Sequence, residues 1–112
     1  MIENALAIGS VLKGATTYTI EKQLHCGGFG MTYLAKARIM VGNIPQVAMF
    51  TIKEFFIGKI CSRDTNGNVL VAQENQQLFK QAKQDFREEA EILHSLKHAN
   101  IVPVNEVFEQ NN

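Results

Sequence analysis

Alternation of apolar and polar residues, a period of two, is typical of strands, and one such segment lies in the first half of the chain. Residues 18–24 place Tyr18, Ile20 and Leu24 on one side, with charged residues between them, which predicts a half-buried strand. Residues 31–40 and 46–56 are rich in β-compatible side chains and are separated by a turn sequence containing glycine and proline. Three antiparallel strands in a meander are the simplest arrangement.

In the second half of the chain, the spacing of the apolar residues changes. Residues 65–68, Thr-Asn-Gly-Asn, form a tight-turn sequence between short apolar runs, so residues 57–76 predict a small hairpin excursion. From 74 to 97 the apolar positions recur at steps of three and four, which predicts one long amphipathic helix. Its inward positions are Phe79, Ala82, Phe86, Ala90, Leu93 and Leu96 or Lys97. Residues 100–104 then turn the chain, and 104–108 predict a last strand.

These elements predict an α+β fold, in which a twisted antiparallel β-sheet packs against one long helix and a hairpin is inserted between the third strand and the helix. With 112 residues, 46% of them hydrophobic, the chain can bury one modest core. We therefore expect a single domain over residues 1–112.

Charge and cysteine content exclude several classes of function. The 11 basic residues equal the 11 acidic residues, so the chain lacks the positive field of a nucleic-acid or anionic-membrane binder. Cys26 and Cys61 have neither the number nor the spacing of a disulfide framework or a zinc site, which predicts reduced thiols and a cytoplasmic location. The first 17 residues contain no long apolar run, so no export signal or membrane anchor is expected. The three histidines have no metal-site or triad spacing.

Two features suggest phosphate chemistry. The glycine-rich residues 26–30 join two predicted strands, and backbone amides in such a turn can cradle anionic oxygens, although an ordinary hairpin turn fits equally. Lys53 lies in the third predicted strand, where a lone lysine would be a solvated charge. A phosphate-directed lysine benefits from an orienting carboxylate, and Glu89 shares the inward helix face with Phe86 and Leu93, whereas Glu88 and Glu91 point elsewhere.

Four segments, in order, resemble the N-terminal lobe of bacterial serine/threonine protein kinases with the eukaryotic-like fold, over about residues 12–109. Residues 24–35 are similar to the glycine-rich loop, with a Thr-Tyr pair after Gly-Gly-Phe-Gly, and 50–53 are similar to the V-A-I-K strand. Residues 86–93 resemble the αC helix, and 96–102 resemble L-x-H-P-N-I-V with Ala99 in place of proline. Two further residues depart from the family pattern: His25 at the first glycine position and Thr51 at the alanine position.

The resemblance implies binding of ATP, with Mg²⁺ ligands in a C-lobe that this sequence lacks. It assigns nucleotide binding to Leu24, Cys26, Gly27, Gly28, Phe29, Gly30, Thr32, Thr51 and Lys53. Lys53 would contact the α and β phosphates, and Glu89 would form the supporting ion pair with it. The family's H-R-D-x-x-x-x-N and D-F-G motifs are absent, so no catalytic residue and no turnover are expected from this polypeptide alone.

The intact parent would then transfer the γ-phosphoryl of ATP to serine or threonine hydroxyls of a protein substrate. Without its C-lobe, the fragment would expose apolar surface and self-associate. The hairpin over 57–76 also resembles a variant of bacterial kinases, and it is either a plain surface excursion or a regulatory element. Two other hypotheses stay open: a noncatalytic, pseudokinase-like interaction module, consistent with His25 and Thr51, and an α+β domain unrelated to nucleotides.

Overall fold

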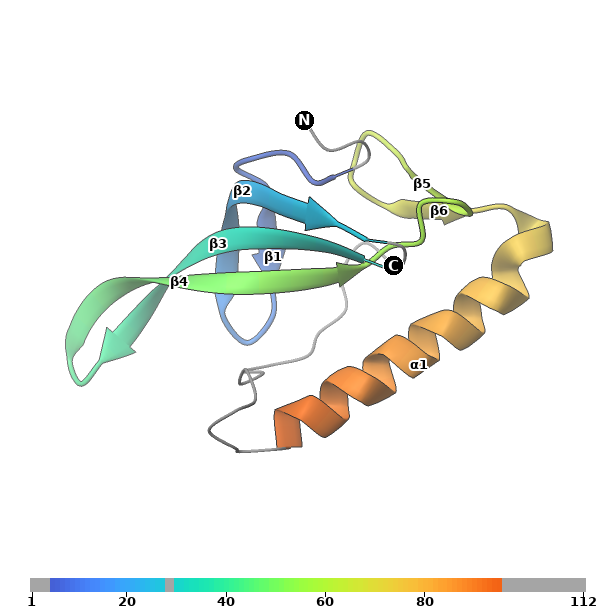
Figure 1. The fold of residues 1–112 in the computed structure, drawn as a ribbon. Helices are drawn as coiled ribbons and strands as arrows, with labels where there is room; N and C mark the ends of the chain where they lie inside the picture. The colour runs from blue at the N-terminus through green and yellow to red at the C-terminus, as the bar shows by residue number, and fades with distance from the viewer. Residues whose placement is uncertain (1–4, 28–29, 96–112) are drawn as a thin grey trace.

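The computed structural model describes residues 5–27 and 30–95. Four strands form one antiparallel sheet in the order β1-β2-β3-β4, so that each strand pairs with its neighbour in sequence (Figure 1). The strands are β1 (Val11–Lys13), β2 (Thr17–Cys26), β3 (Gly30–Val41) and β4 (Ile44–Phe55). The predicted three-strand meander is confirmed, and β1 is an addition that the sequence did not predict. A strand of three residues is too short for alternation to reveal it.

The core lies on one face of this sheet. Along β3, residues Met31, Tyr33, Ala35 and Ala37 are buried, while the residues between them are at least partly exposed. This alternation follows from the pleat, because successive side chains of a strand point to opposite faces. The other buried side chains come from the remaining elements: Leu6, Leu12, Tyr18, Ile20, Phe56, Ile57, Cys61, Val69 and Phe79.

Irregular pairing in β2 corrects the prediction for Leu24. Register shifts occur between Ile20 and Lys22 and again between Gln23 and His25. Each extra residue transfers the following side chains to the opposite face. Tyr18 and Ile20 are buried as predicted, but Leu24 is 44% exposed, and Gln23 is half-buried instead.

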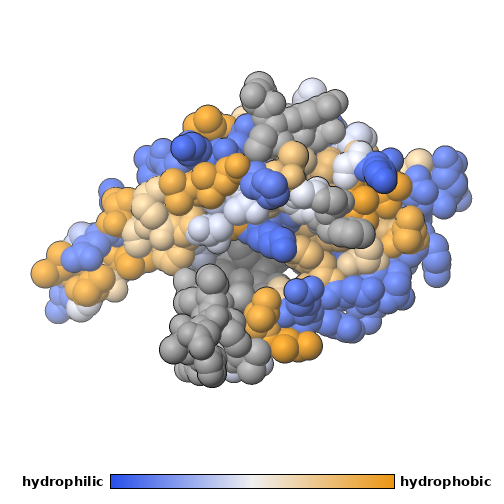
Figure 2. All heavy atoms as spheres, in the orientation of Figure 1, coloured by the Kyte–Doolittle hydropathy of each residue, from blue (hydrophilic) through white to orange (hydrophobic). Residues whose placement is uncertain are grey.

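Strands β3 and β4 continue past the rest of the sheet as a two-stranded ribbon (Figure 1). The ribbon closes on a two-residue turn between Val41 and Ile44, in which Gly42 has a φ of 64° that favours glycine. We call the end of this ribbon, residues 39–47, the hairpin tip. Met40, Val41, Ile44 and Val47 in the hairpin tip are all more than half exposed, and Figure 2 shows apolar side chains there.

A second, smaller hairpin follows the sheet. Strands β5 (Cys61–Arg63) and β6 (Val69–Val71) pair antiparallel, and a short 3-10 turn, η1 (Gln73–Asn75), leads into the helix α1 (Gln76–Ser95). We call residues 61–71 the β5–β6 hairpin. Among the described residues, no helix is long and apolar enough to span a membrane.

The helix contacts the sheet through one face, as its sequence period predicted. Phe79 is buried, and Ala82, Phe86, Ala90 and Leu93 are half-buried. Phe55 at the end of β4 packs between Phe79 and Phe86, with ring centroids 5.3 Å from each. The predicted strand over 104–108, the turn over 100–104 and the helical positions 96 and 97 lie outside the described residues.

Candidate functional site

The glycine-rich segment joins β2 to β3 at one end of the sheet. The last paired residues are Cys26 and Met31, and the amide of Gly27 donates a 2.8 Å hydrogen bond to the carbonyl of Gly30. Cys26 and Gly27 are exposed, whereas Gly30 is buried. Gly28 and Phe29, two of the predicted nucleotide-binding residues, lie outside the described residues. We call residues 26–30, which the hydrogen bond between Gly27 and Gly30 closes, the glycine turn; its described residues Cys26 and Gly27 are open to solvent.

Gly30 is the point where this turn meets β4. A Cβ atom placed on Gly30 would lie 2.7 Å from the backbone oxygen of Glu54 and 3.6 Å from Cε of Lys53. Real carbon atoms do not approach a carbonyl oxygen so closely, so only glycine fits here. The glycine-rich segment and the lysine strand are consequently in direct backbone contact.

The register brings three of the singled-out residues into one row across the sheet. His25 is opposite Thr32, and Thr32 is opposite Lys53. Residues directly opposite one another project from the same face, so this row lies on the sheet face opposite Tyr33 and Ala35. Thr51 lies two residues before Lys53 and shares its face. Lys53 and Thr51 are exposed, and Thr32 is half-buried.

Helix α1 does not supply the predicted carboxylate to Lys53. The ammonium Nζ of Lys53 lies 5.7 Å from the ring centroid of Phe86, a cation–π distance. Among the described residues, Lys53 and Glu89 form no ion pair, and Glu89 is exposed. The prediction that Glu89 shares the inward face is wrong for this structure. At about 100° per residue, Glu89 lies about 60° around the helix from Phe86, at the flank of the contacting face.

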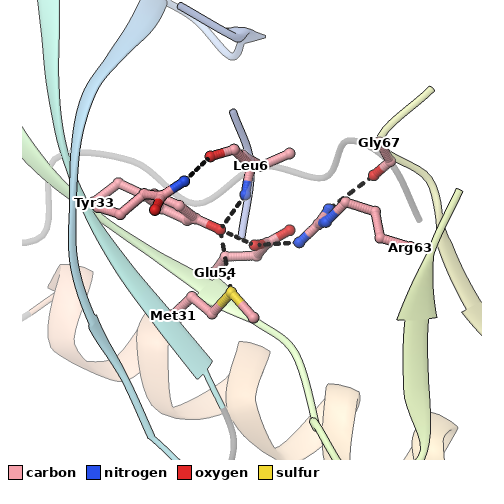
Figure 3. Close-up of polar contacts among 7 residues, drawn as sticks. Leu6, Met31, Tyr33, Glu54, Arg63 and Gly67 are labelled. Atoms are coloured by element: carbon pink, nitrogen blue, oxygen red, sulfur yellow. Dashed lines mark hydrogen bonds and ion pairs between the residues drawn. The ribbon is translucent and has the colours of Figure 1, made fainter. Parts of the chain in front are cut away.

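The opposite face of β4 carries a polar network that the sequence analysis missed (Figure 3). The Tyr33 hydroxyl donates a 2.7 Å hydrogen bond to Oε1 of Glu54, and it accepts a 3.1 Å bond from the backbone amide of Leu6. The same Oε1 accepts a 2.7 Å bond from Nη2 of Arg63, and Nη1 of Arg63 donates to the carbonyl of Gly67 at 2.8 Å. The network thus joins β3, β4, the N-terminal segment and the β5–β6 hairpin.

This network is well shielded from water. The side chains of Arg63 and Glu54 are 7% and 16% exposed, and the Arg63 guanidinium lies 5.1 Å from the ring centroid of Phe56. Burial raises the pKa of Tyr33, and its hydrogen bond to Glu54 raises the pKa further, while the Leu6 amide opposes both. Tyr33 is therefore a neutral hydroxyl at any physiological pH. Burial also raises the pKa of the Cys61 thiol nearby.

The sequence contained only weak signs of these contacts. Glu54 follows Lys53 in a segment that is otherwise apolar from Ile52 to Ile57, so the alternation of a strand places the two charges on opposite faces. Nothing in the sequence singles out Arg63 as the partner of Glu54, because it lies nine residues away in a separate strand, β5. Phe86 was predicted to face inward, but its contact with Lys53 depends on the position of the whole helix.

No group of three histidine, cysteine, aspartate or glutamate side chains within residues 5–27 and 30–95 is placed to hold a metal ion. Two open hollows of about 490 and 340 Å³ lie beside the β5–β6 hairpin, and neither is lined by Lys53 or a glycine-loop residue. The candidate site is therefore an open sheet face rather than an enclosed pocket. Its described residues offer one cation, Lys53, together with the glycine turn, Thr32 and the exposed side chain of Leu24.

Comparison with known proteins shows a similarity of fold to a solved structure. No protein-family model matches the sequence, and no curated protein matches it significantly. Among solved structures, the chain is similar to the apo form of PpkA-294, with a TM-score of 0.82 and 21% sequence identity. The match covers 97% of this chain and 36% of PpkA-294. The chain therefore has the fold of part of PpkA-294, an antiparallel sheet with one helix.

Proposed function

We propose that this chain is the ATP-binding N-lobe of a serine/threonine protein kinase. The observation that carries the proposal is the position of Lys53: its Cε is beside Gly30 at the base of the glycine turn, and it lies in one row with Thr32. A strand lysine at the foot of a glycine-rich turn is the arrangement that holds phosphates in kinases. The fold shared with PpkA-294 supports the same assignment.

In this proposal the chain's own residues bind and orient the nucleotide. Backbone amides of the glycine turn donate hydrogen bonds to phosphate oxygens, Lys53 neutralises their charge, and Leu24 and Thr32 cover the base. Glu89 reaches Lys53 only after helix α1 rotates by about 60°, since it now lies at the flank of the helix. Mg²⁺ and the transfer of the γ-phosphoryl to protein hydroxyls belong to a C-lobe, whose motifs this sequence does not contain.

The test is titration of the chain with a fluorescent ATP analogue, comparing the Lys53→Met variant with wild type. Loss of a charge-assisted contact to phosphate, roughly 1.5–3 kcal/mol, should weaken binding by about 10- to 100-fold. Lys36→Met is the matched control, because Lys36 is also a strand lysine but pairs with Glu21 at 2.7 Å. If the wild-type chain does not bind the analogue, or if Lys53→Met binds as tightly, the proposal fails.

A noncatalytic interaction module is the second candidate, and one observation favours it. Lys53 faces the Phe86 ring rather than Glu89, so the ion pair of an active kinase is not formed. The His25 and Thr51 departures point the same way. In this case Lys53→Met would leave the affinity for a partner protein unchanged, and the wild-type chain would show no saturable nucleotide binding.

A further inference from the structure

The β5–β6 hairpin contacts the lysine strand directly behind the candidate site. Lys53 and Glu54 are consecutive in β4, so their side chains project from opposite faces of the sheet. Lys53 lies toward Phe86 of helix α1. Glu54 lies toward Tyr33 and Arg63, as Figure 3 shows. Any shift of the backbone at Glu54 therefore moves Lys53 on the other side.

Glu54 is held from two directions by short contacts to a single oxygen. Oε1 accepts 2.7 Å hydrogen bonds from the Tyr33 hydroxyl and from Nη2 of Arg63. Arg63 is fixed in turn, because its other terminal nitrogen donates to the carbonyl of Gly67 and its guanidinium stacks on Phe56. A guanidinium with two fixed hydrogen-bond partners has few rotamers left, so it transmits the position of the β5–β6 hairpin to β4.

The same stretch of β4 supports the glycine turn. The backbone oxygen of Glu54 lies where a Cβ on Gly30 would be, and Met31 is the register partner of Glu54. Tyr33 on β3 is one residue from Thr32, which is opposite Lys53. The network thus anchors, from behind, both strands that carry the proposed phosphate contacts.

We propose that Arg63 is a positioning residue: through Glu54 and Tyr33, the β5–β6 hairpin sets the position of Lys53 relative to the glycine turn. The predicted effect of Arg63 on nucleotide affinity rests on the proposed function. The placement of Lys53 itself is independent of that function. The hairpin is then a structural support of the phosphate site and not a plain surface excursion.

The experiment uses NMR of the chain with ¹³C-dimethylated lysines, a modification that keeps the positive charge. The Lys53 methyl signal reports its distance from Phe86, because an aromatic ring shifts the resonances of groups above it. In Arg63→Met this signal should shift, and affinity for the ATP analogue should fall by about 3- to 30-fold. In Glu21→Gln, which breaks the exposed pair between Glu21 and Lys36, both should match wild type.

A second variant guards against loss of folding, since Arg63→Met leaves the Glu54 carboxylate buried without its cation. The double variant Glu54→Met with Arg63→Met replaces the ion pair by apolar side chains of similar length, an exchange that buried pairs commonly tolerate. It should fold and still show the displaced Lys53 signal. An unshifted Lys53 signal in this folded double variant overturns the inference. If the Lys53 signal shifts in the double variant but the wild-type chain binds no nucleotide, the positioning role of Arg63 is supported. Only the proposed function is then overturned.

Discussion

At the scale of single residues, the closest backbone approach near the candidate site is at Gly30. It is buried and pairs with Phe55, and the carbonyl of Glu54 occupies the space that any side chain would need. The φ of Gly30 is not in the left-handed region, so the requirement for glycine here is steric rather than conformational. The φ of Gly58 is not in the left-handed region either. In contrast to Gly30, no atom lies within 4 Å of the place where a Cβ on Gly58 would be.

This difference predicts opposite outcomes for two glycine-to-alanine variants. Gly30→Ala should lower the free energy of unfolding by about 2 kcal/mol, because the neighbour that must move is backbone rather than a flexible side chain. Gly58→Ala should change it by less than about 0.5 kcal/mol. Urea denaturation followed by circular dichroism measures both values. A Gly30→Ala variant as stable as Gly58→Ala would show that the two strands are not in contact at this point.

At the scale of elements, the β5–β6 hairpin depends on one aspartate in its turn. Oδ1 of Asp64 accepts hydrogen bonds from the backbone amides of Asn66 and Asn68, at 2.8 and 2.9 Å. Gly67, with a φ of 87°, allows the chain to reverse there. The Asn68 amide, followed by the other turn groups, holds the pKa of the Asp64 carboxyl below its ordinary value.

A lowered pKa predicts how this hairpin responds to acid. The folded turn binds fewer protons than the unfolded chain, so the contribution of Asp64 is complete above the ordinary carboxyl pKa of about 3.9. It is lost as the pH falls through the lowered pKa of the folded turn. Amide-exchange protection factors of Asn66 and Asn68, corrected for intrinsic rates, should therefore be lower at pH 2.5 than at pH 6.

The control for this prediction is Asp64→Asn, which keeps an oxygen acceptor but cannot ionise. Its protection factors should depend less on pH than those of the wild type. Equal acid sensitivity in the two proteins would mean that another group, or global unfolding, governs the turn.

At the scale of the whole molecule, apolar surface is concentrated on the ribbon that extends from the sheet. Ile44 and Val47 are each 64% exposed and Met40 is 62% exposed, all in the hairpin tip. Burying a side chain of this size contributes about 1.5–3 kcal/mol. We propose that a second copy of the chain covers the hairpin tip at high concentration, which would account for the expected self-association.

Sedimentation velocity over a range of concentrations tests this proposal. The wild-type sedimentation coefficient should rise with concentration, and Ile44→Lys should reduce the rise. Leu78→Lys is the matched control, because Leu78 is 59% exposed but lies on helix α1. A wild-type chain that stays monomeric contradicts the proposal. An equal effect of the two variants would place the contact elsewhere.

Much of the fold followed from local patterns. The β-compatible residues over 31–40 and the three-to-four spacing over 74–97 predicted β3 and α1, whose described bounds are Gly30–Val41 and Gln76–Ser95, because residue type and backbone geometry act locally. The glycine turn and Lys53 were also found from sequence, since residue type and order carry that information. The proposed nucleotide-binding roles of these residues remain predictions.

Other features depended on distances that no local pattern contains. The exposure of Leu24 follows from the register shift between Ile20 and Lys22, whose position is settled by pairing with β3. Glu89 lies away from Lys53 because Phe55 packs between Phe79 and Phe86 and so sets the rotation of the helix. The period of the sequence gives the direction of a helix face only approximately. Glu89 lies about 60° around the helix from Phe86, and Glu89 is exposed whereas Phe86 is half-buried.

The sequence by itself determined the strands, the helix and the residue types at the glycine turn, because these depend on neighbours along the chain. Only the tertiary structure decided which side chain meets the Lys53 ammonium and which cation meets Glu54. Both contacts join elements whose relative position comes from packing the core, where Tyr33, Phe56 and Ile20 are fully buried. Such positions result from the sum of many weak contacts, and no single segment of sequence encodes them.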